Sequence, residues 1–155
     1  MIEITWWAAY TFLGIWLQDL FSGIDCFGPV LILCLQNGRY KSLFWLALVW
    51  ILIQEGTGSL PFGSSLLYYG GLAAFFLASR PYLKTGSLPF ILFLSILAGL
   101  WYVLSIHLFV SLQPIQVDLM QLAGQAARLT MAFPLLWLLV STIYTWWISP
   151  GYARN

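Results

Sequence analysis

The chain has 155 residues, of which 61% are hydrophobic, 18% are aromatic and only 7% are charged, and its net charge is +1. Soluble domains carry charge on about a quarter of their residues, so this composition argues against a soluble protein. Six basic residues are too few for nucleic-acid binding, which depends on many phosphate contacts. The apolar runs are continuous and lack the alternation of barrel strands, which predicts helices. We therefore predict an all-α integral membrane protein.

Six apolar segments predict a six-transmembrane-helix bundle in a single transmembrane domain, 1–155, since a crossing takes about 20 residues. The predicted helices lie at about 4–20, 24–36, 42–55, 62–79, 88–112 and 130–148. The first lacks a basic leader and a small-residue cleavage site, so we expect it to be retained. In the second, only Phe27 to Leu35 is continuously apolar. This segment is therefore a short or tilted crossing, or a re-entrant hairpin.

The fourth predicted helix, 62–79, carries small residues along its length, among them Gly63, Gly70 and Gly71. Small residues allow helix backbones to approach closely in a membrane, where hydrophobicity does not drive helices together. We therefore expect this helix to be the most tightly packed of the bundle.

Residues 115–129 differ from the apolar segments around them. Apolar residues recur there at helical spacing, with polar residues between them: Ile115, Leu119, Leu122, Ala126 and Leu129. The pattern predicts an amphipathic helix that lies in the membrane interface. The last crossing, 130–148, is then a separate helix with Pro134 inside it.

Basic and acidic residues alternate in groups along the chain, and lysine and arginine set the orientation of a membrane protein. With six crossings and the N-terminus inside, the interior side holds Arg39, Lys41, Arg80, Lys84 and Arg154. The exterior side holds Asp19, Asp25, Glu55 and Asp118, with Arg128 as the basic exception. We therefore predict an N-in/C-in topology. The pattern also favours a full crossing for the second segment, because otherwise the basic turns would lie on opposite sides.

Glu55 is the most prominent single candidate, because it ends an apolar helix beside Gln54 and precedes a glycine-rich turn. An ionisable residue at membrane depth suggests a functional role. Two interpretations remain open. The carboxylate either stabilises the turn or the interface, or it contacts a specific partner or ligand.

The sequence favours structural roles for the other polar residues. Asp19 and Asp25 flank the first exterior turn and are expected to be solvated. Tyr68 and Tyr69 are expected to pack with aromatic residues rather than to line a pocket. His107 has no carboxylate near it in sequence and is expected to pack at the interface.

The two cysteines, Cys26 and Cys34, lack a nearby histidine or further cysteine to complete a metal site, so we expect them to pack. The sequence shows no nucleophile–base arrangement, phosphate-binding loop or nucleotide fingerprint. It also shows no internal repeat of the kind found in coupled transporters. We therefore predict a non-enzymatic protein that uses no cofactor or metal, and a scaffolding role.

The stretch from Ala47 to Leu66 reads ALVWILIQEGTGSLPFGSSL. An apolar helix ends there in an acid, a glycine-bearing turn follows, and a Phe-Gly pair opens the next helix. This order resembles MreD, the rod shape-determining membrane protein family of bacteria, of which the chain is identified as a divergent member. The short second segment and Phe133-Pro134-Leu135 in the last helix are similar as well. The predicted motif or partner-contact residues are Glu55, Gly58, Pro61, Phe62, Gly63, Gly70, Gly71 and Pro134.

The resemblance implies a non-enzymatic scaffold of the bacterial cell-elongation machinery, which serves rod shape and peptidoglycan synthesis. It also implies a multi-pass protein of the bacterial cytoplasmic (inner) membrane. The implied partners are membrane lipid, an MreC-like bitopic protein and other proteins of the elongation machinery, without nucleic acid.

The MreD fold is thought to be similar to the substrate-binding subunits of energy-coupling-factor vitamin transporters. This gives an alternative function, in which the protein binds a small vitamin-type molecule for such a transporter. That function needs a polar pocket near the outer face, whereas a scaffold needs an apolar face such as 62–79. The outer half offers few polar groups, namely Glu55, Ser64, Ser65, His107 and Gln113. The sequence therefore favours the scaffold.

Overall fold

The computed structural model describes residues 2–21, 24–56, 63–112 and 118–147. Of these residues 87% are helical, in six helices, and none lies in a strand. The helices are α1 (Ile2–Leu20), α2 (Phe27–Gln36), α3 (Tyr40–Gly56), α4 (Ser64–Ser79), α5 (Leu88–Leu112) and α6 (Leu119–Trp147). The predicted all-α class is confirmed.

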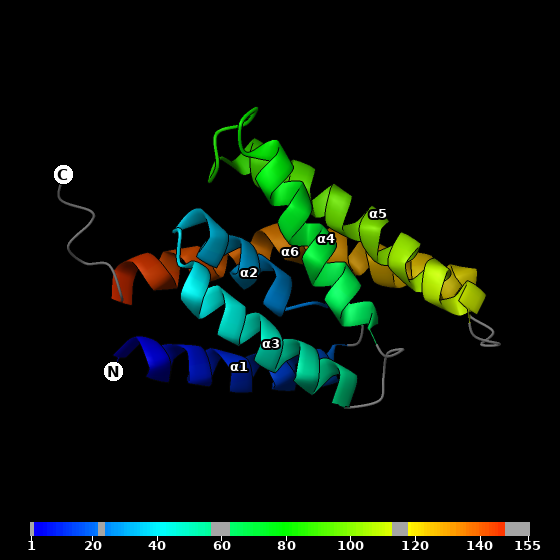
Figure 1. Ribbon diagram of the computed structural model, residues 1–155, viewed down its shortest axis with the longest axis horizontal. Helices are drawn as coiled ribbons and strands as arrows, with labels where there is room; N and C mark the ends of the chain where they lie inside the picture. The colour runs from blue at the N-terminus through cyan, green and yellow to red at the C-terminus, as the bar shows by residue number, and fades with distance from the viewer. Residues whose placement is uncertain (1, 22–23, 57–62, 113–117, 148–155) are drawn as a thin grey trace.

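Successive helices run in alternating directions, so the start of α1 and the end of α6 lie on the same side of the molecule (Figure 1). Side-chain contacts hold this side together. The rings of Trp7 and Tyr144 are 5.8 Å apart, and Trp137 Nε1 donates a hydrogen bond to Gln36 Oε1 at 3.2 Å. The ends of α1, α3 and α5 meet the starts of α2, α4 and α6 on the opposite side.

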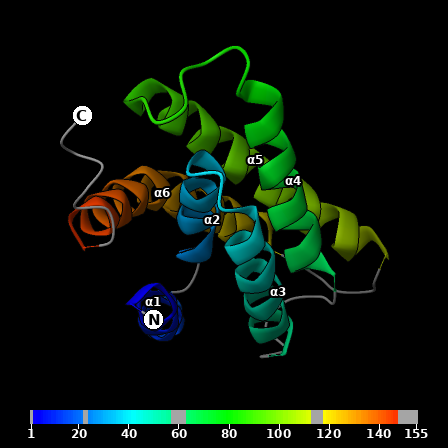
Figure 2. The same ribbon diagram turned by 60° about the vertical axis from the view of Figure 1, so that its left-hand side comes forward.

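The short helix α2 forms the centre of the core. All nine residues from Phe27 to Leu35 are buried, and α2 packs against α3, α4 and α6, as both ribbon views show (Figures 1 and 2). A helix that is apolar on all sides is buried by its neighbours. Ten residues span only about 15 Å, and other helices of the protein surround most of this helix. It is one continuous helix and not a re-entrant hairpin.

The expectation that the fourth helix is the most tightly packed is wrong. Six of the sixteen residues of α4 are buried, against nine of the ten residues of α2. The apolar run of α2 needs no polar face because other helices cover it on most sides, whereas α4 leaves one face outside the bundle. Within the described residues, α2 is therefore the most enclosed helix.

α6 is one continuous helix where the sequence pattern predicted two. The expected interfacial helix, 115–129, and the expected crossing, 130–148, join without a break, and the helix continues through Pro134. Its buried residues recur at intervals of three and four on one face: Leu122, Ala126, Leu129, Phe133, Trp137, Val140 and Tyr144. Because this apolar face continues across residue 130, nothing ends the helix there. The prediction of a separate helix is wrong, and 113–117 lie outside the described residues.

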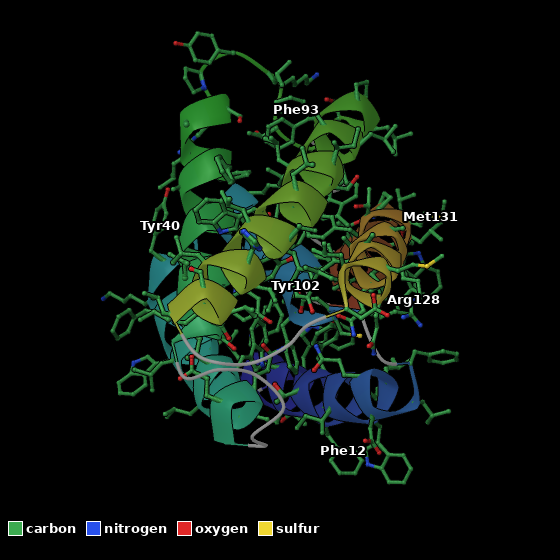
Figure 3. All side chains as sticks on the ribbon, turned by 90° about the vertical axis from the view of Figure 1, so that its right-hand side faces the viewer. Phe12, Tyr40, Phe93, Tyr102, Arg128 and Met131 are labelled. Carbon is green, nitrogen blue, oxygen red and sulfur yellow. The ribbon has the colours of Figure 1, made fainter. Side chains whose placement is uncertain are left out.

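Among the described residues, two helices are long and apolar enough to cross a membrane by length and composition: Leu88–Leu112 of α5 and Leu119–Trp146 of α6. The shorter helices α2 and α4 are apolar as well. Outward faces are also apolar. On α5 one such face carries Leu92, Ile96, Leu100 and Leu104, each more than half exposed. Phe12 of α1 and Met131 of α6 likewise point away from the bundle (Figure 3).

Two glycines bring neighbouring helices together. A Cβ at Gly71 of α4 would collide with the indole of Trp101 of α5, which donates a hydrogen bond to the carbonyl of Leu67 at 3.1 Å. A Cβ at Gly99 of α5 would collide with the hydroxyl of Thr130 of α6. At Gly70 the same atom would meet nothing within 4 Å. Gly71 therefore packs closely inside the bundle, whereas Gly70 faces outward.

Helix α1 lies at the edge of the bundle (Figure 2) and is attached by a few specific contacts. Trp50 Nε1 of α3 donates a hydrogen bond to Thr11 Oγ1 at 2.9 Å. The Tyr10 hydroxyl donates to the carbonyl of Cys26. The ring of Trp50 in turn stacks on Phe27 at 4.7 Å, which connects α1 through α3 to the core.

Candidate functional site

A cavity of about 620 Å³ opens on the side of the bundle opposite to the start of α1. Five helices, α1, α3, α4, α5 and α6, contribute lining residues, and so does the segment that precedes α2. The described lining comprises seventeen residues, and eleven of them are polar. Most of the cavity surface is nevertheless apolar, and an apolar surface with several polar groups directed at one space is the composition usual for a ligand site.

Asp25 lies at the base of the cavity, in the short segment that precedes α2. Its Oδ1 accepts hydrogen bonds from the amide of Phe27 and the hydroxyl of Tyr69, both at 2.9 Å. Its Oδ2 accepts the amide of Gly28 at 3.1 Å. A side chain at Gly28 would clash with this oxygen, so the glycine permits the approach. The carboxylate thus caps α2, and the expectation that Asp25 is solvated is wrong.

Two glutamines connect Asp25 to α1 and α3. The amide of Gln18 donates to Asp25 Oδ1, and the amide of Gln54 donates to Gln18 Oε1, both at 3.5 Å. Asp19 also lines the cavity, but its side chain is largely exposed. The polar chain therefore runs from α3 across α1 to the start of α2.

Three tyrosines form an aromatic wall. The ring of Tyr68 lies edge-on to Tyr69 at 5.2 Å and to Tyr102 at 5.9 Å. The Tyr102 hydroxyl donates to Gln125 Oε1 at 3.2 Å, and Figure 3 shows Tyr102 in the middle of this end of the bundle. Tyr68 and Tyr69 pack together as expected. They also line the cavity, so the prediction against a pocket role is wrong.

Three seryl hydroxyls complete the lining. Ser64, Ser65 and Ser105 are only 2–3% exposed, and their Oγ atoms have no hydrogen-bond partner among the described residues. Serines in helices usually bond back to a carbonyl of the preceding turn, as Ser95 does to Leu92 at 2.8 Å. A buried hydroxyl without a partner costs free energy. The three oxygens are covered by other atoms in this conformation, so a molecule in the cavity would contact them only after their side chains rotate.

Glu55 is not among the residues that line the cavity. Its Oε1 accepts the amide of Gly63 at 3.0 Å. Gly63 is the N-cap of α4 and has φ +88°, in the left-handed region that favours glycine. Of the two interpretations left open, this contact matches a carboxylate that stabilises the turn.

The remaining predicted motif residues do not gather at one site. Gly58, Pro61 and Phe62 lie outside the described residues. Gly70 and Gly71 lie in the middle of α4, and Pro134 lies inside α6.

The other sequence candidates lie elsewhere. The side chain of His107 is exposed and does not line the cavity, and Gln113 is outside the described residues. Cys26 and Cys34 are buried, and neither forms a disulfide within the described residues. Within the described residues no group of three or more His, Cys, Asp or Glu side chains is placed to hold a metal ion.

The sequence contained a signal for the cavity that its single residues did not show. Polar residues occur toward the C-terminal ends of the first, third and fifth helices and toward the N-terminal ends of the second, fourth and sixth: Gln18, Asp25, Gln54, Ser64, Ser105 and Gln125. In a bundle of alternating helices these positions fall at one level. Taken one by one they resemble ordinary helix ends, so the cavity emerges only from the topology.

Comparisons with protein-family models, curated proteins and solved structures find no match to this chain.

Proposed function

We propose that this protein is a multi-pass membrane protein that binds a small molecule in the cavity at one end of its helical bundle. The observation that carries the proposal is a group of three buried hydroxyls, on Ser64, Ser65 and Ser105, that have no hydrogen-bond partner among the described residues. A cavity of about 620 Å³ falls within the range of about 300–1,000 Å³ that is usual for ligand sites. A bound molecule would satisfy these hydroxyls and remove the cost of burying them.

The membrane assignment is supported by the length of α5 and α6 and by the apolar outward faces. We propose six crossings in a bacterial inner membrane, with both termini inside. In this orientation the interior side holds the basic residues that follow α2 and α4, namely Arg39, Lys41, Arg80 and Lys84. The cavity lies at the opposite ends of these two helices and therefore faces the exterior. A binding site open to the exterior suits the substrate-binding subunit of an energy-coupling-factor transporter, which is the alternative that the sequence left open.

Analysis of co-purified small molecules tests this proposal. The protein is extracted in mild detergent, and bound molecules are quantified per protein by mass spectrometry after denaturation. Ser105→Ala is expected to reduce the bound amount, and Ser95→Ala serves as the control because its hydroxyl is bonded within α5. A bound molecule that both variants retain equally, or none in the unchanged protein, contradicts the proposal.

A second candidate function is the scaffold of the cell-elongation machinery that the resemblance implies. The hydrogen bond from Gly63 to Glu55 supports it, because this bond joins the two halves of the stretch that resembles MreD. Small residues on the outward face of α4, Gly70, Ala74 and Ala78, are exposed and would allow close approach by a partner helix.

Co-purification with an MreC-like bitopic protein tests the scaffold. Gly70→Leu adds bulk on the outward face without meeting a described neighbour, so it is expected to weaken the association while the bundle remains folded. Unchanged co-purification in a stable, inserted Gly70→Leu protein contradicts this function. The binding function is independent of that result, because Gly70 faces outward and does not line the cavity.

A further inference from the structure

We infer that the cavity selects a molecule with a positively charged nitrogen, an ammonium group, and that Asp25 is its anionic partner. This inference rests on the proposed binding function and names the class of ligand. Four observations support it: the charge of the lining, the partners of Asp25, the aromatic wall and the free hydroxyls.

The charge of the lining is entirely negative. Asp19 and Asp25 line the cavity, and none of the described lining residues is Lys, Arg or His. Arg128 is the basic residue nearest in sequence to the lining residue Gln125, but its side chain is exposed and bonds to the carbonyl of Gly124. Figure 3 shows Arg128 on the outer side of α6, away from Tyr102. An anionic ligand would therefore meet carboxylates without a compensating cation.

The described partners of Asp25 are all uncharged. They are the amides of Phe27 and Gly28, the hydroxyl of Tyr69 and the side-chain amide of Gln18. The amides of Phe27 and Gly28 belong to the first turn of α2 and carry the partial positive charge of a helix N-terminus. The four donors match the number that a carboxylate can accept, about four. An ammonium group would therefore replace the Gln18 amide, the most distant donor at 3.5 Å, because a charged donor binds a carboxylate more strongly than a neutral one. The cavity therefore presents a half-buried carboxyl group whose pKa is raised by burial, and a cation beside this group would favour its ionised form.

The walls complement an ammonium ion in two ways. The rings of Tyr68, Tyr69 and Tyr102 line the cavity beside Asp25, and aromatic faces attract cations. The oxygens of Ser64 and Ser65 can accept hydrogen bonds from the N–H groups of the ligand. Because a hydroxyl can also donate, the same serines can bind polar groups elsewhere on the molecule.

Three probes of matched size test the inference: 2-phenylethylamine, which is cationic at pH 7, 2-phenylethanol, which is neutral, and phenylacetate, which is anionic. Binding to the purified full chain is measured by calorimetry. We expect the amine to bind at least about tenfold more tightly than either other probe. Equal or tighter binding of the alcohol or the acid overturns the inference, and so does a failure of all three to bind. The proposed function is judged separately, by the co-purified molecule and its dependence on Ser105.

Two aspartates at helix starts provide matched variants. Asp118 Oδ1 accepts the amide of Met120 at the start of α6, outside the lining of the cavity. Asp25→Asn is expected to weaken amine binding about tenfold and leave the alcohol unchanged, whereas Asp118→Asn changes neither. Equal amine affinity in Asp25→Asn and the unchanged protein overturns the inference.

Variants of Gln18 keep the test decisive if Asp25→Asn fails to fold. The Gln18 amide lies 3.5 Å from Asp25 Oδ1, so Gln18→Lys would place a competing cation beside an intact carboxylate. We expect Gln18→Lys to abolish the preference for the amine and Gln18→Met to retain it. An amine preference that persists in Gln18→Lys overturns the inference.

An ammonium group can belong to a free amine or to the headgroup of an aminophospholipid. The amine titration is therefore repeated in nanodiscs of phosphatidylglycerol with and without phosphatidylethanolamine. Competition by phosphatidylethanolamine supports a lipid headgroup as the source, and amine binding of equal strength in both supports a free amine.

Discussion

Ser95 and Ser105 lie on the same helix, and both are 2% exposed, but their hydroxyls differ in hydrogen bonding. Ser95 bonds to the carbonyl of Leu92, whereas Ser105 has no partner among the described residues. A protein usually avoids an unpaired buried hydroxyl, because the group loses water without gaining a partner. At the wall of a binding site such a hydroxyl lowers the stability of the empty protein but can bind a ligand, so binding and stability favour different residues there.

The first prediction follows from this opposition. In protein stripped of small molecules, Ser105→Ala is expected to raise the free energy of unfolding by about 1–3 kcal/mol, because it removes an unsatisfied hydroxyl. Ser95→Ala is expected to have a small effect or to destabilise. Thermal unfolding followed by circular dichroism measures both. A Ser105→Ala protein less stable than Ser95→Ala would show that the Ser105 hydroxyl has a partner.

Glu55 supports a second prediction at this scale. Glu55→Ala is expected to lower the free energy of unfolding by about 1 kcal/mol, because the amide of Gly63 loses its acceptor. Glu55→Gln is the control, since its carbonyl oxygen can still accept. Stability is read from thermal unfolding. If Glu55→Gln keeps its stability but loses an MreC-like partner, the partner-contact interpretation is favoured over a purely structural role.

Adjacent glycines on α4 give a prediction for the packing of elements. Gly71→Leu is expected to lower the free energy of unfolding by about 1–3 kcal/mol, because its side chain would have to displace the indole of Trp101. Gly70→Leu is expected to leave stability nearly unchanged. The two variants differ by one position, so they share composition and hydrophobicity. Equal melting temperatures would contradict the close contact between α4 and α5.

The helices themselves were largely predictable from the sequence, because apolar runs and glycine or proline turns mark their limits. The segment 88–112 matches α5 at both ends. The pattern at 115–129 was misinterpreted because Gln121 and Arg128 lie on the outward face of α6, while Leu122 and Leu129 continue the buried face. Polar residues on one face of a helix do not end it when the apolar face continues.

The cavity was harder to predict than the helices because it depends on contacts between distant residues. Tyr69 and Asp25 are hydrogen-bonded across 44 positions, and Tyr102 and Gln125 across 23. Composition and spacing within one segment contain no information on such pairs. Glu55 stood out in sequence because it interrupts an apolar run, whereas Ser105 did not, and only the fold shows which of them lines the cavity.

For the whole molecule, the topology leads to a prediction that thiol labelling can test. Tyr82 and Met120 are 86% and 84% exposed and lie at opposite ends of α5, while the native Cys26 and Cys34 are buried. In intact cells an impermeant maleimide is expected to label Met120→Cys and not Tyr82→Cys, and lysis is expected to expose both. Labelling of both in intact cells, or the reverse pattern, contradicts six crossings with the termini inside.

The enclosure of α2 has a consequence for biogenesis. In the proposed membrane topology its ten residues are too few to partition into the bilayer as an independent span, and its three neighbours, α3, α4 and α6, are all synthesised after it. Gln36 receives its hydrogen bond from Trp137, 101 positions later. The core can therefore close only when α6 has been translated, and until then the newly made α2 depends on α3 or on an insertase to shield it.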